Sequence, residues 1–329
     1  MFNKSELEQT AAALYRFMQP TPQYNWPLLC RDSGADVWVK HENHTPTAAF
    51  KVRGGLNLVS RLVAGDDRPK GILSATRGNH GQSLSYAGSK LGLPVTIVVP
   101  ECNNPDQNRM IESFGAELVI HGEDFEAARA FSLSLQQEKG YMTIPPFDRD
   151  LVLGVATYAL EFLSCVDDLD SVYVPIGMGS GIAGLIRTRD LLGLKTKIIG
   201  VVAEGAPTFS LSFKAGRIVN TDRADTIADG VATRAPMQEA FDTIKTGADH
   251  IVVVSDSEIA AAMYQYYQGT HNLAEGAGAV ALAGLMQEKV RMKDKKVGVI
   301  LSGGNIDFAS FSRHVAPFSM LDQAPSSSA

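Results

Sequence analysis

Short apolar runs alternate along the chain with segments long enough to form helices. Strands are predicted at residues 37–40, 71–75, 95–99, 117–120, 171–175, 197–202, 250–254 and 296–301. Continuous runs rich in Val and Ile, separated by helices, are typical of parallel sheets that are covered on both faces. The pattern therefore predicts an α/β protein built from doubly wound open sheets.

Helix start signals support this alternation. Helices are predicted near the start of the chain and at residues 47–62, 80–91, 106–114, 124–139, 182–192 and after 255. Ser5 with Glu8, and Ser255 with Glu258, have the spacing of a capping box. Thr47 is the candidate N-cap of the second helix.

Composition narrows the class of protein. The chain has 329 residues, 45% of them hydrophobic, and a net charge of −6, which indicates roughly two globular domains. A mildly acidic chain without a basic tract argues against nucleic-acid and anionic-membrane partners. Its apolar runs are shorter than the roughly 20 residues of a membrane span. Low-complexity residues 321–329 are expected to be disordered.

Cysteine and histidine spacing carries no metal-binding signal. Cys30, Cys102 and Cys165 are odd in number and far apart. This pattern favours a reducing, cytoplasmic compartment over a disulfide framework. The seven histidines include no H-x-x-x-H spacing, and no metal site is predicted.

Three glycine-rich loops follow predicted strands, at the edge where parallel sheets bind ligands. Residues 175–184 join a strand to a helix with four glycines, and converging N–H groups there form a phosphate cradle. Residues 74–82 carry polar groups that suit a substrate carboxylate. Residues 301–305 place the hydroxyl of Ser302 where it can face a ring nitrogen or a phosphate.

Lys51 is a candidate nucleophile. It lies early in a predicted helix between Phe50 and Val52. Burial among apolar neighbours disfavours the charged form of lysine, which suits an amine that forms a Schiff base. The alternative is a surface lysine with its stem packed on the protein.

The first loop also fits a nicotinamide site. Residues 179–184 read G-x-G-x-x-G, and Glu204 follows about 20 residues later, as in dinucleotide-binding folds. This alternative predicts an NAD(P)-dependent oxidoreductase. It leaves Lys51, Asn79 and Ser302 unexplained.

Taken in order, these segments are more specific than any one alone. The sequence Phe50-Lys51, the Gly-Asn-His-Gly of residues 78–81, the glycine loop and the Ser-Gly-Gly-Asn of residues 302–305 resemble the fold-type II pyridoxal-phosphate enzymes. Within them, the chain resembles the serine/threonine dehydratases. The resemblance implies a larger domain from residues 1–71 and 150–320, a smaller αβ domain from residues 72–149, and a homodimer.

The resemblance also assigns site residues. Lys51 would hold the cofactor as a Schiff base and remove the substrate Cα proton, and Phe50 would pack beside the ring. Asn79 would bond the phenolic oxygen, and Ser302, followed by Gly303, would face the pyridine nitrogen. The phosphate would lie on Gly177, Met178, Gly179, Ser180 and Gly181. The substrate carboxylate would lie on Thr76, Arg77, Gly78, Asn79 and His80.

The implied reaction is elimination of water from a β-hydroxy amino acid such as threonine or serine, or a bulkier or acidic 3-hydroxy amino acid. The products would be a 2-oxo acid and ammonia. The leaving hydroxyl needs a proton, which the Lys51 ammonium or the cofactor phosphate could supply. The sequence leaves both sources open.

Two alternatives share this fold, and residues 76–81 bear on both. Cysteine synthases, which catalyse β-replacement, usually have Thr where this chain has His80. Serine racemases have an acid–base serine at the position of Arg77, and a guanidinium is a poor proton shuttle.

Arg77 could bind a second acidic group on the substrate or pair with a nearby acidic side chain. A non-catalytic binding protein on this scaffold is disfavoured by the intact Lys51.

Overall fold

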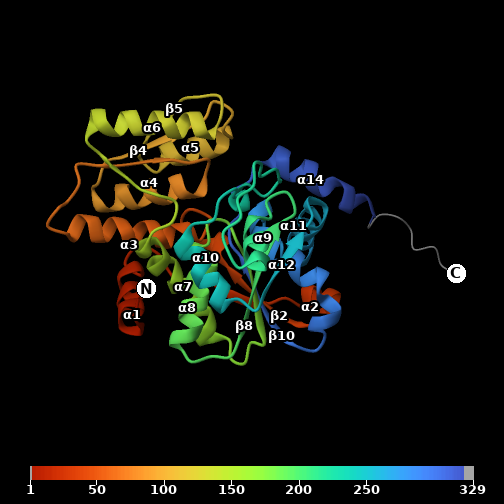
Figure 1. Cartoon of the computed structure of the whole chain (residues 1–329). Helices are drawn as coiled ribbons and strands as arrows, with labels where there is room; N and C mark the ends of the chain where they lie inside the picture. Colours follow the sequence, from red (N-terminus) through yellow and green to blue (C-terminus); the bar gives the residue numbers. More distant parts are fainter. Residues whose placement is uncertain (1, 322–329) are drawn as a thin grey trace.

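The computed structural model describes residues 2–321 and contains two sheets with helices packed against them (Figure 1). The strands of the six-stranded sheet are, in spatial order, β1 (Gln23–Asn25), β2 (Asp36–His41), β10 (Lys296–Leu301), β7 (Ser171–Pro175), β8 (Lys197–Ala203) and β9 (His250–Val254). The strands of the four-stranded sheet are β5 (Glu117–Ile120), β4 (Val95–Val99), β3 (Ile72–Ala75) and β6 (Met142–Thr143). Every pairing is parallel except that of β1 with β2.

Helices occupy the connections between the strands. They are α1 (Lys4–Leu14), α2 (Pro27–Ser33), α3 (Lys51–Ala64), α4 (Asn79–Leu91), α5 (Pro105–Ser113), α6 (Phe125–Lys139), α7 (Arg149–Cys165), α8 (Ser180–Leu191), α9 (Thr208–Ala215), α10 (Gln238–Gly247), α11 (Asp256–Thr270), α12 (Gly276–Gln287), α13 (Lys289–Met292) and α14 (Phe308–Leu321). Two short 3-10 helices, η1 (Glu42–His44) and η2 (Asp229–Val231), complete the elements.

Helices cover both faces of the six-stranded sheet. Its strands direct alternate side chains to opposite sides, so neighbouring residues are buried in different cores. Val201 packs into a core with α11 and α12, whereas its neighbour Val202 packs into a core with α7 and α8. The smaller sheet shows the same division, since Ile72 and Leu73 belong to different cores. Both sheets therefore have the doubly wound architecture that the sequence predicts.

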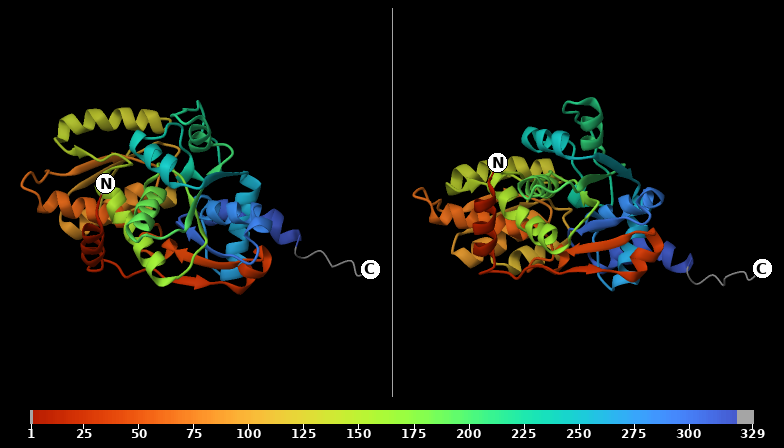
Figure 2. Two further views of the ribbon diagram at one scale, coloured as in Figure 1. Left: turned by 60° about the horizontal axis from the view of Figure 1, so that its bottom comes forward. Right: turned by 90° about the horizontal axis from the view of Figure 1, so that it is seen from below.

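Helix α3 connects the two sheets. It packs against α4, which follows the first strand of the smaller sheet, and against α7, which packs on the larger one. Helix α1, at the N-terminal end of the chain, contacts α7 and α3 (Figure 2). Helix α3 is thus held by helices that pack on both sheets.

Some local predictions were wrong. The capping box of α1 is formed by Asn3 and Glu6 instead of Ser5 and Glu8, while the box at the start of α11 is confirmed. Thr47 does not cap α3, which begins four residues later at Lys51. The antiparallel edge strand β1 and the two-residue strand β6 were not predicted, because such short segments carry little periodicity.

Residues 322–329 lie outside the described part of the chain, so the expectation of a disordered tail is not addressed there. Among the described helices, none has the length and apolar character that crossing a bilayer requires.

Candidate active site

A pocket of about 430 Å³ opens where four helices, α3, α4, α8 and α12, begin. The pocket is lined by Phe50, Lys51, Asn79, Pro175, Gly177, Met178, Gly179, Ser180, Gly181, Gly230, Val231, Glu275, Ala277 and Ser302. Nine of the fourteen lining residues were predicted as site residues from the sequence, and they come from four separate segments.

The turn before α3 places Lys51 at the pocket wall. The hydroxyl of Thr45 bonds both the N–H and the carbonyl of Ala49, at 2.9 and 2.8 Å. The N–H of Phe50 donates to the carbonyl of Ser302 at 3.0 Å, and Ala49 forms a bridge with Gly303. These bonds hold the start of α3 against the loop that follows β10.

The side chain of Lys51 is suited to act as a nucleophile or a base. Burial lowers its pKa, and the nearby carboxyl of Glu275 opposes that shift. Within residues 2–321, no group accepts a hydrogen bond from the Nζ atom of Lys51. An amine with a lowered pKa and no fixed partner is available for covalent chemistry.

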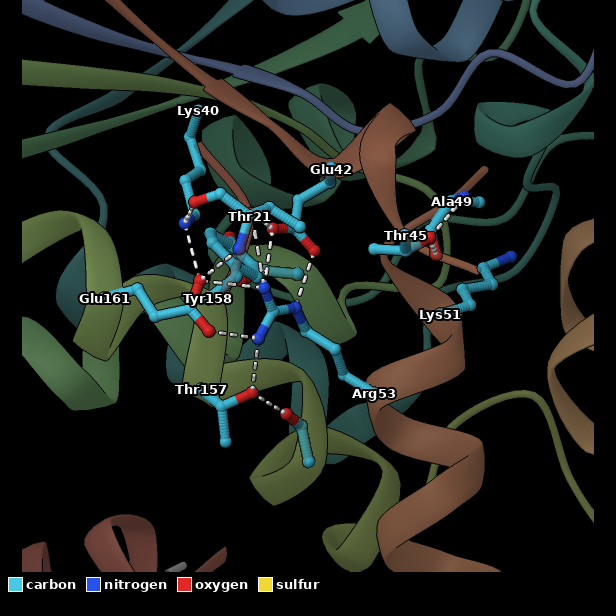
Figure 3. Close-up of polar contacts among 12 residues, drawn as sticks. Thr21, Lys40, Glu42, Thr45, Ala49, Lys51, Arg53, Thr157, Tyr158 and Glu161 are labelled. Atoms are coloured by element: carbon cyan, nitrogen blue, oxygen red, sulfur yellow. Dashed lines mark hydrogen bonds and ion pairs between the residues drawn. The ribbon is translucent and has the colours of Figure 1, made fainter. Parts of the chain in front are cut away.

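A buried ionic cluster anchors α3 beside this amine (Figure 3). Arg53 is fully buried and bonds Glu42 and Glu161, each at 2.7 Å. Lys40 bonds the same Glu161 at 2.6 Å. Arg53 extends from α3 toward this cluster, while Lys51 extends away from it. The cluster therefore fixes the first turn of α3 without occupying the pocket.

The glycine loop after β7 forms a cradle of backbone groups. Gly179 has a φ of +98°, which favours glycine, and it precedes α8 without a side-chain cap. A Cβ on Gly177 would lie 2.2 Å from the carbonyl oxygen of Gly230. The first N–H groups of a helix have no partners within the helix. The loop can therefore bind a phosphate on backbone donors.

Two further predicted residues border the pocket from the sides. The ring of Phe50 packs edge-on against Tyr158, whose hydroxyl donates to the carbonyl of Gly181 at 2.9 Å. The hydroxyl of Ser302 donates to the carbonyl of Ala277 at 3.3 Å. Phe50 thus connects the start of α3 with the phosphate cradle through Tyr158, and Ser302 connects the end of β10 with α12.

Two polar residues of the pocket lining, Asn79 and Glu275, are bonded to each other. Asn79 donates from Nδ2 to Oε1 of Glu275 at 2.7 Å, and its Oδ1 accepts from Asn305 at 2.7 Å. Burial raises the pKa of Glu275 to about 7, against the lowering effects of Asn79 and Lys51. The sequence analysis did not single out Glu275. A carboxyl among glycines and alanines was the available signal.

The rest of the predicted substrate loop lies outside the pocket lining. The hydroxyl of Thr76 accepts from the N–H of Gly78 at 3.3 Å, and a Cβ on Gly78 would lie 2.9 Å from the side chain of Gln107. Arg77 is half exposed and lies 3.8 Å from Asp229. These residues form one edge of the site.

His80 and Gly303 each follow a lining residue in the sequence, Asn79 and Ser302 respectively. His80 is buried, its Nε2 has no partner in the described chain, and burial followed by the charge of Lys51 lowers its pKa to about 3. Gly303 leaves room for a neighbouring carboxyl, since a Cβ there would lie 2.4 Å from Oε1 of Glu275. Neither residue lines the pocket.

The donor set fits pyridoxal phosphate. Lys51 offers an amine to an aldehyde, the glycine loop offers N–H groups to a phosphate, and Ser302 offers a hydroxyl to a ring nitrogen. The nicotinamide alternative requires an acid at the ribose, but Glu204 is not among the residues that line this pocket. Fold and site together define a fold-type II pyridoxal-phosphate enzyme.

The comparisons with known proteins agree with this class. The model of the family described as "Pyridoxal-phosphate dependent enzyme" matches residues 14–303, and the chain belongs to that family. The L-threonine ammonia-lyase of Geobacter sulfurreducens is 36% identical over 280 residues, which cover 85% of this chain and 69% of the relative. The L-threo-3-hydroxyaspartate ammonia-lyase of Saccharomyces cerevisiae is 32% identical over 296 residues, or 90% of each chain.

Solved structures show the same architecture. The processed form of threonine deaminase isoform 2 from Solanum lycopersicum superposes with a TM-score of 0.88 at 30% identity. The match covers 96% of this chain and 94% of that one. The fold predicted from the sequence, two doubly wound sheets of the fold-type II class, is confirmed.

Proposed function

We propose that this enzyme eliminates water from a β-hydroxy amino acid and releases a 2-oxo acid and ammonia. The observation that carries the proposal is the amine of Lys51, placed at the wall of a pocket that also contains the glycine cradle. The names of the two relatives, ammonia-lyases for threonine and for 3-hydroxyaspartate, support this reaction class. Candidate substrates are threonine, serine and a bulkier or acidic 3-hydroxy amino acid.

The residues of the chain divide the work of the reaction. Bound pyridoxal phosphate supplies an electron sink for the pair left on the substrate Cα. Lys51 would hold the cofactor, and its amine, when free, would remove the Cα proton as general base. The cradle of residues 177–181 fixes the phosphate, so that the reacting atoms are oriented before the chemistry begins.

The remaining roles belong to the polar groups at the pocket edge. Asn79 would donate to the phenolic oxygen of the cofactor, and Ser302 would face the pyridine nitrogen. A hydroxyl, unlike an aspartate, need not keep that nitrogen protonated. The loop of Thr76, Arg77, Gly78, Asn79 and His80 binds the substrate carboxylate. It follows β3, whose carboxyl end adjoins the pocket through Asn79.

The test is a substrate panel with the purified enzyme and added cofactor. Ammonia and 2-oxo acid are measured with serine, threonine, 3-hydroxyaspartate and phenylserine as substrates, in both enantiomeric series. The proposal predicts equimolar release of both products from at least one of them. If an added thiol is incorporated in place of the hydroxyl, or if the enantiomer accumulates without ammonia, the β-replacement or racemisation alternative holds instead.

We also propose an oligomeric state, a cellular compartment and domain boundaries for this protein. A homodimer follows from the family resemblance, and exposed apolar side chains on neighbouring elements, Leu28, Tyr267 and Phe308, offer a surface for it. Light scattering would give the mass of the assembly. A cytoplasmic location is proposed from the three cysteines, which are free. We assign residues 72–149 to a smaller domain, inserted between residues 1–71 and 150–320 of the larger.

A further inference from the structure

The carboxyl of Glu275 occupies an unusual position for a residue that precedes a helix. Glu275 is the N-cap residue of α12, yet its side chain makes no capping bond to that helix. Instead it lines the pocket and accepts the hydrogen bond from Asn79. The missing side chain at Gly303 makes this orientation possible, because a Cβ there would collide with Oε1. The local structure thus directs an acidic group toward the cofactor site.

The surroundings of this carboxyl give its neutral form a much larger share near neutral pH than an ordinary glutamate has. Burial is the largest effect on its pKa, and the carboxylate of Asp229 adds to the increase. Asn79 and Lys51 oppose the increase, and the pKa is raised to about 7. Asp229 and Lys51 are the charged groups that act on it. A carboxyl with a pKa near the working pH can both hold and release a proton.

The two oxygens of Glu275 have different surroundings. Oε1 accepts from Asn79, which suits the carbonyl oxygen of a carboxylic acid. Oε2 makes no hydrogen bond to any residue in the described chain. In the neutral acid, the O–H group on Oε2 is therefore a donor without a protein acceptor. Since Glu275 lines the same pocket as Lys51, this donor is available to a substrate.

We propose that Glu275 is the general acid that protonates the leaving hydroxyl. This inference rests on the proposed elimination. Lys51 takes the Cα proton, and the electron pair of that bond forms the Cα–Cβ double bond. The Cβ–O bond breaks with its pair on oxygen, which takes the proton of Glu275 and leaves as water. The carboxylate of Glu275 then regains a proton as Lys51 releases the one that it took.

A change of leaving group separates acid catalysis from positioning. Chloride leaves without a proton, so 3-chloroalanine needs no general acid, whereas serine does. In Glu275→Gln the Oε1 acceptor for Asn79 is kept and the acidic proton is lost. We expect kcat for serine to fall about 100-fold or more, the usual range for general acid–base catalysis, while kcat for 3-chloroalanine stays within about fivefold.

Other outcomes overturn the inference. Equal losses on both substrates would assign Glu275 a positioning role, and no loss on either would assign the proton to Lys51 or to the cofactor phosphate. Glu239→Gln, at an exposed position on α10, is the control and should leave both rates unchanged. If Glu275→Gln fails to hold the cofactor, the pH profiles of the wild type decide: kcat for serine should fall above about pH 7, where Glu275 loses its proton, and kcat for 3-chloroalanine should not share that fall. The same fall for both substrates would overturn the inference.

The wild-type enzyme distinguishes this inference from the proposed function. Elimination from both substrates by the wild type, with equal losses in the variant, rejects only the role of Glu275. Absence of elimination from serine and every other hydroxy amino acid in the wild type rejects the proposed function itself.

Discussion

The side-chain amide of Asn79 donates a hydrogen bond of 2.7 Å to the carboxyl of Glu275. Asn79 begins α4, which packs on the four-stranded sheet, whereas Glu275 precedes α12, which packs on the six-stranded sheet. One bond therefore joins the two layers at the pocket. Asn305 extends the line from the loop after β10. The site is assembled from both sheets, and each sheet alone holds only part of it.

Removal of the Lys51 amine should abolish both cofactor attachment and turnover. We expect Lys51→Ala to lose the visible absorption band that borohydride removes in the wild type, and to lose kcat by about 1,000-fold or more, because nucleophile and base are lost together. Lys70→Ala, at an exposed position, is the matched control. Full turnover by Lys51→Ala would refute the role of this amine.

Breaking the buried ionic cluster should strongly destabilise the protein. Arg53→Met leaves Glu42 and Glu161 without their guanidinium partner, and removing one partner of a buried ion pair costs about 3–5 kcal/mol. Urea unfolding of the cofactor-loaded enzyme measures the loss. Arg61→Met, which removes a partly exposed pair at 3.3 Å, should cost less than about 1 kcal/mol. Similar losses in the two variants would contradict the proposed anchoring role.

The same cluster predicts a dependence on acid. Burial alone would raise the pKa of Glu161, but the charges and hydrogen bonds of Arg53 and Lys40 hold it below the ordinary 4.5. A depressed pKa gives stability that is present above 4.5 and is lost as pH falls through the folded value. The stability difference between wild type and Arg53→Met should therefore narrow below about pH 4.5, in unfolding curves recorded across the pH range. A difference that stays constant would show that Glu161 does not titrate there.

A methyl group on the phosphate cradle should weaken cofactor binding. In Gly177→Ala the added carbon would lie 2.2 Å from the carbonyl of Gly230, so the loop must move. We expect the Kd for pyridoxal phosphate to rise about tenfold or more, which corresponds to about 1.4 kcal/mol. Gly269→Ala has no contact closer than 3.5 Å and is the control. Titration followed by absorbance measures the Kd of each variant for pyridoxal phosphate. Equal affinity in the two variants would show that residues 177–181 do not bind the cofactor.

Arg77 offers a test of substrate class. The residue lies 3.8 Å from Asp229; Arg77 is half exposed and Asp229 is mostly exposed, so the pair contributes little to stability. If the guanidinium binds a second substrate carboxylate, Arg77→Ala should lower kcat/KM for 3-hydroxyaspartate about tenfold more than for threonine. If Arg77 only pairs with Asp229, the two substrates should lose equally. Steady-state kinetics on both substrates decides.

Several parts of the site could be predicted from the sequence because the topology of parallel sheets brings certain loops together. Loops that follow parallel strands meet at one edge of the sheet, so the glycine loop of residues 175–184 and Ser302 could be placed together. Lys51 was identified by its apolar neighbours and by the motif around it. All three contributions line one pocket in the structure.

Other features depend on contacts between distant residues. The orientation of the Glu275 carboxyl depends on the space at Gly303 and on the hydrogen bond from Asn79, and both residues lie far from it in sequence, so the local pattern shows only an acidic residue among small ones. The first helix offers two matches to one spacing rule, and only the structure shows that Asn3, not Ser5, is the N-cap. The pairing of Arg77 with Asp229 likewise joins separate segments.

The most direct test of the account is the release of products by the purified enzyme with pyridoxal phosphate. Ammonia and 2-oxo acid are measured together for serine, threonine and 3-hydroxyaspartate, with Lys51→Ala in parallel. The account predicts equimolar ammonia and 2-oxo acid from at least one of these substrates, and none from the variant. Absence of both products for every β-hydroxy amino acid, from a wild type that carries bound cofactor, would contradict it.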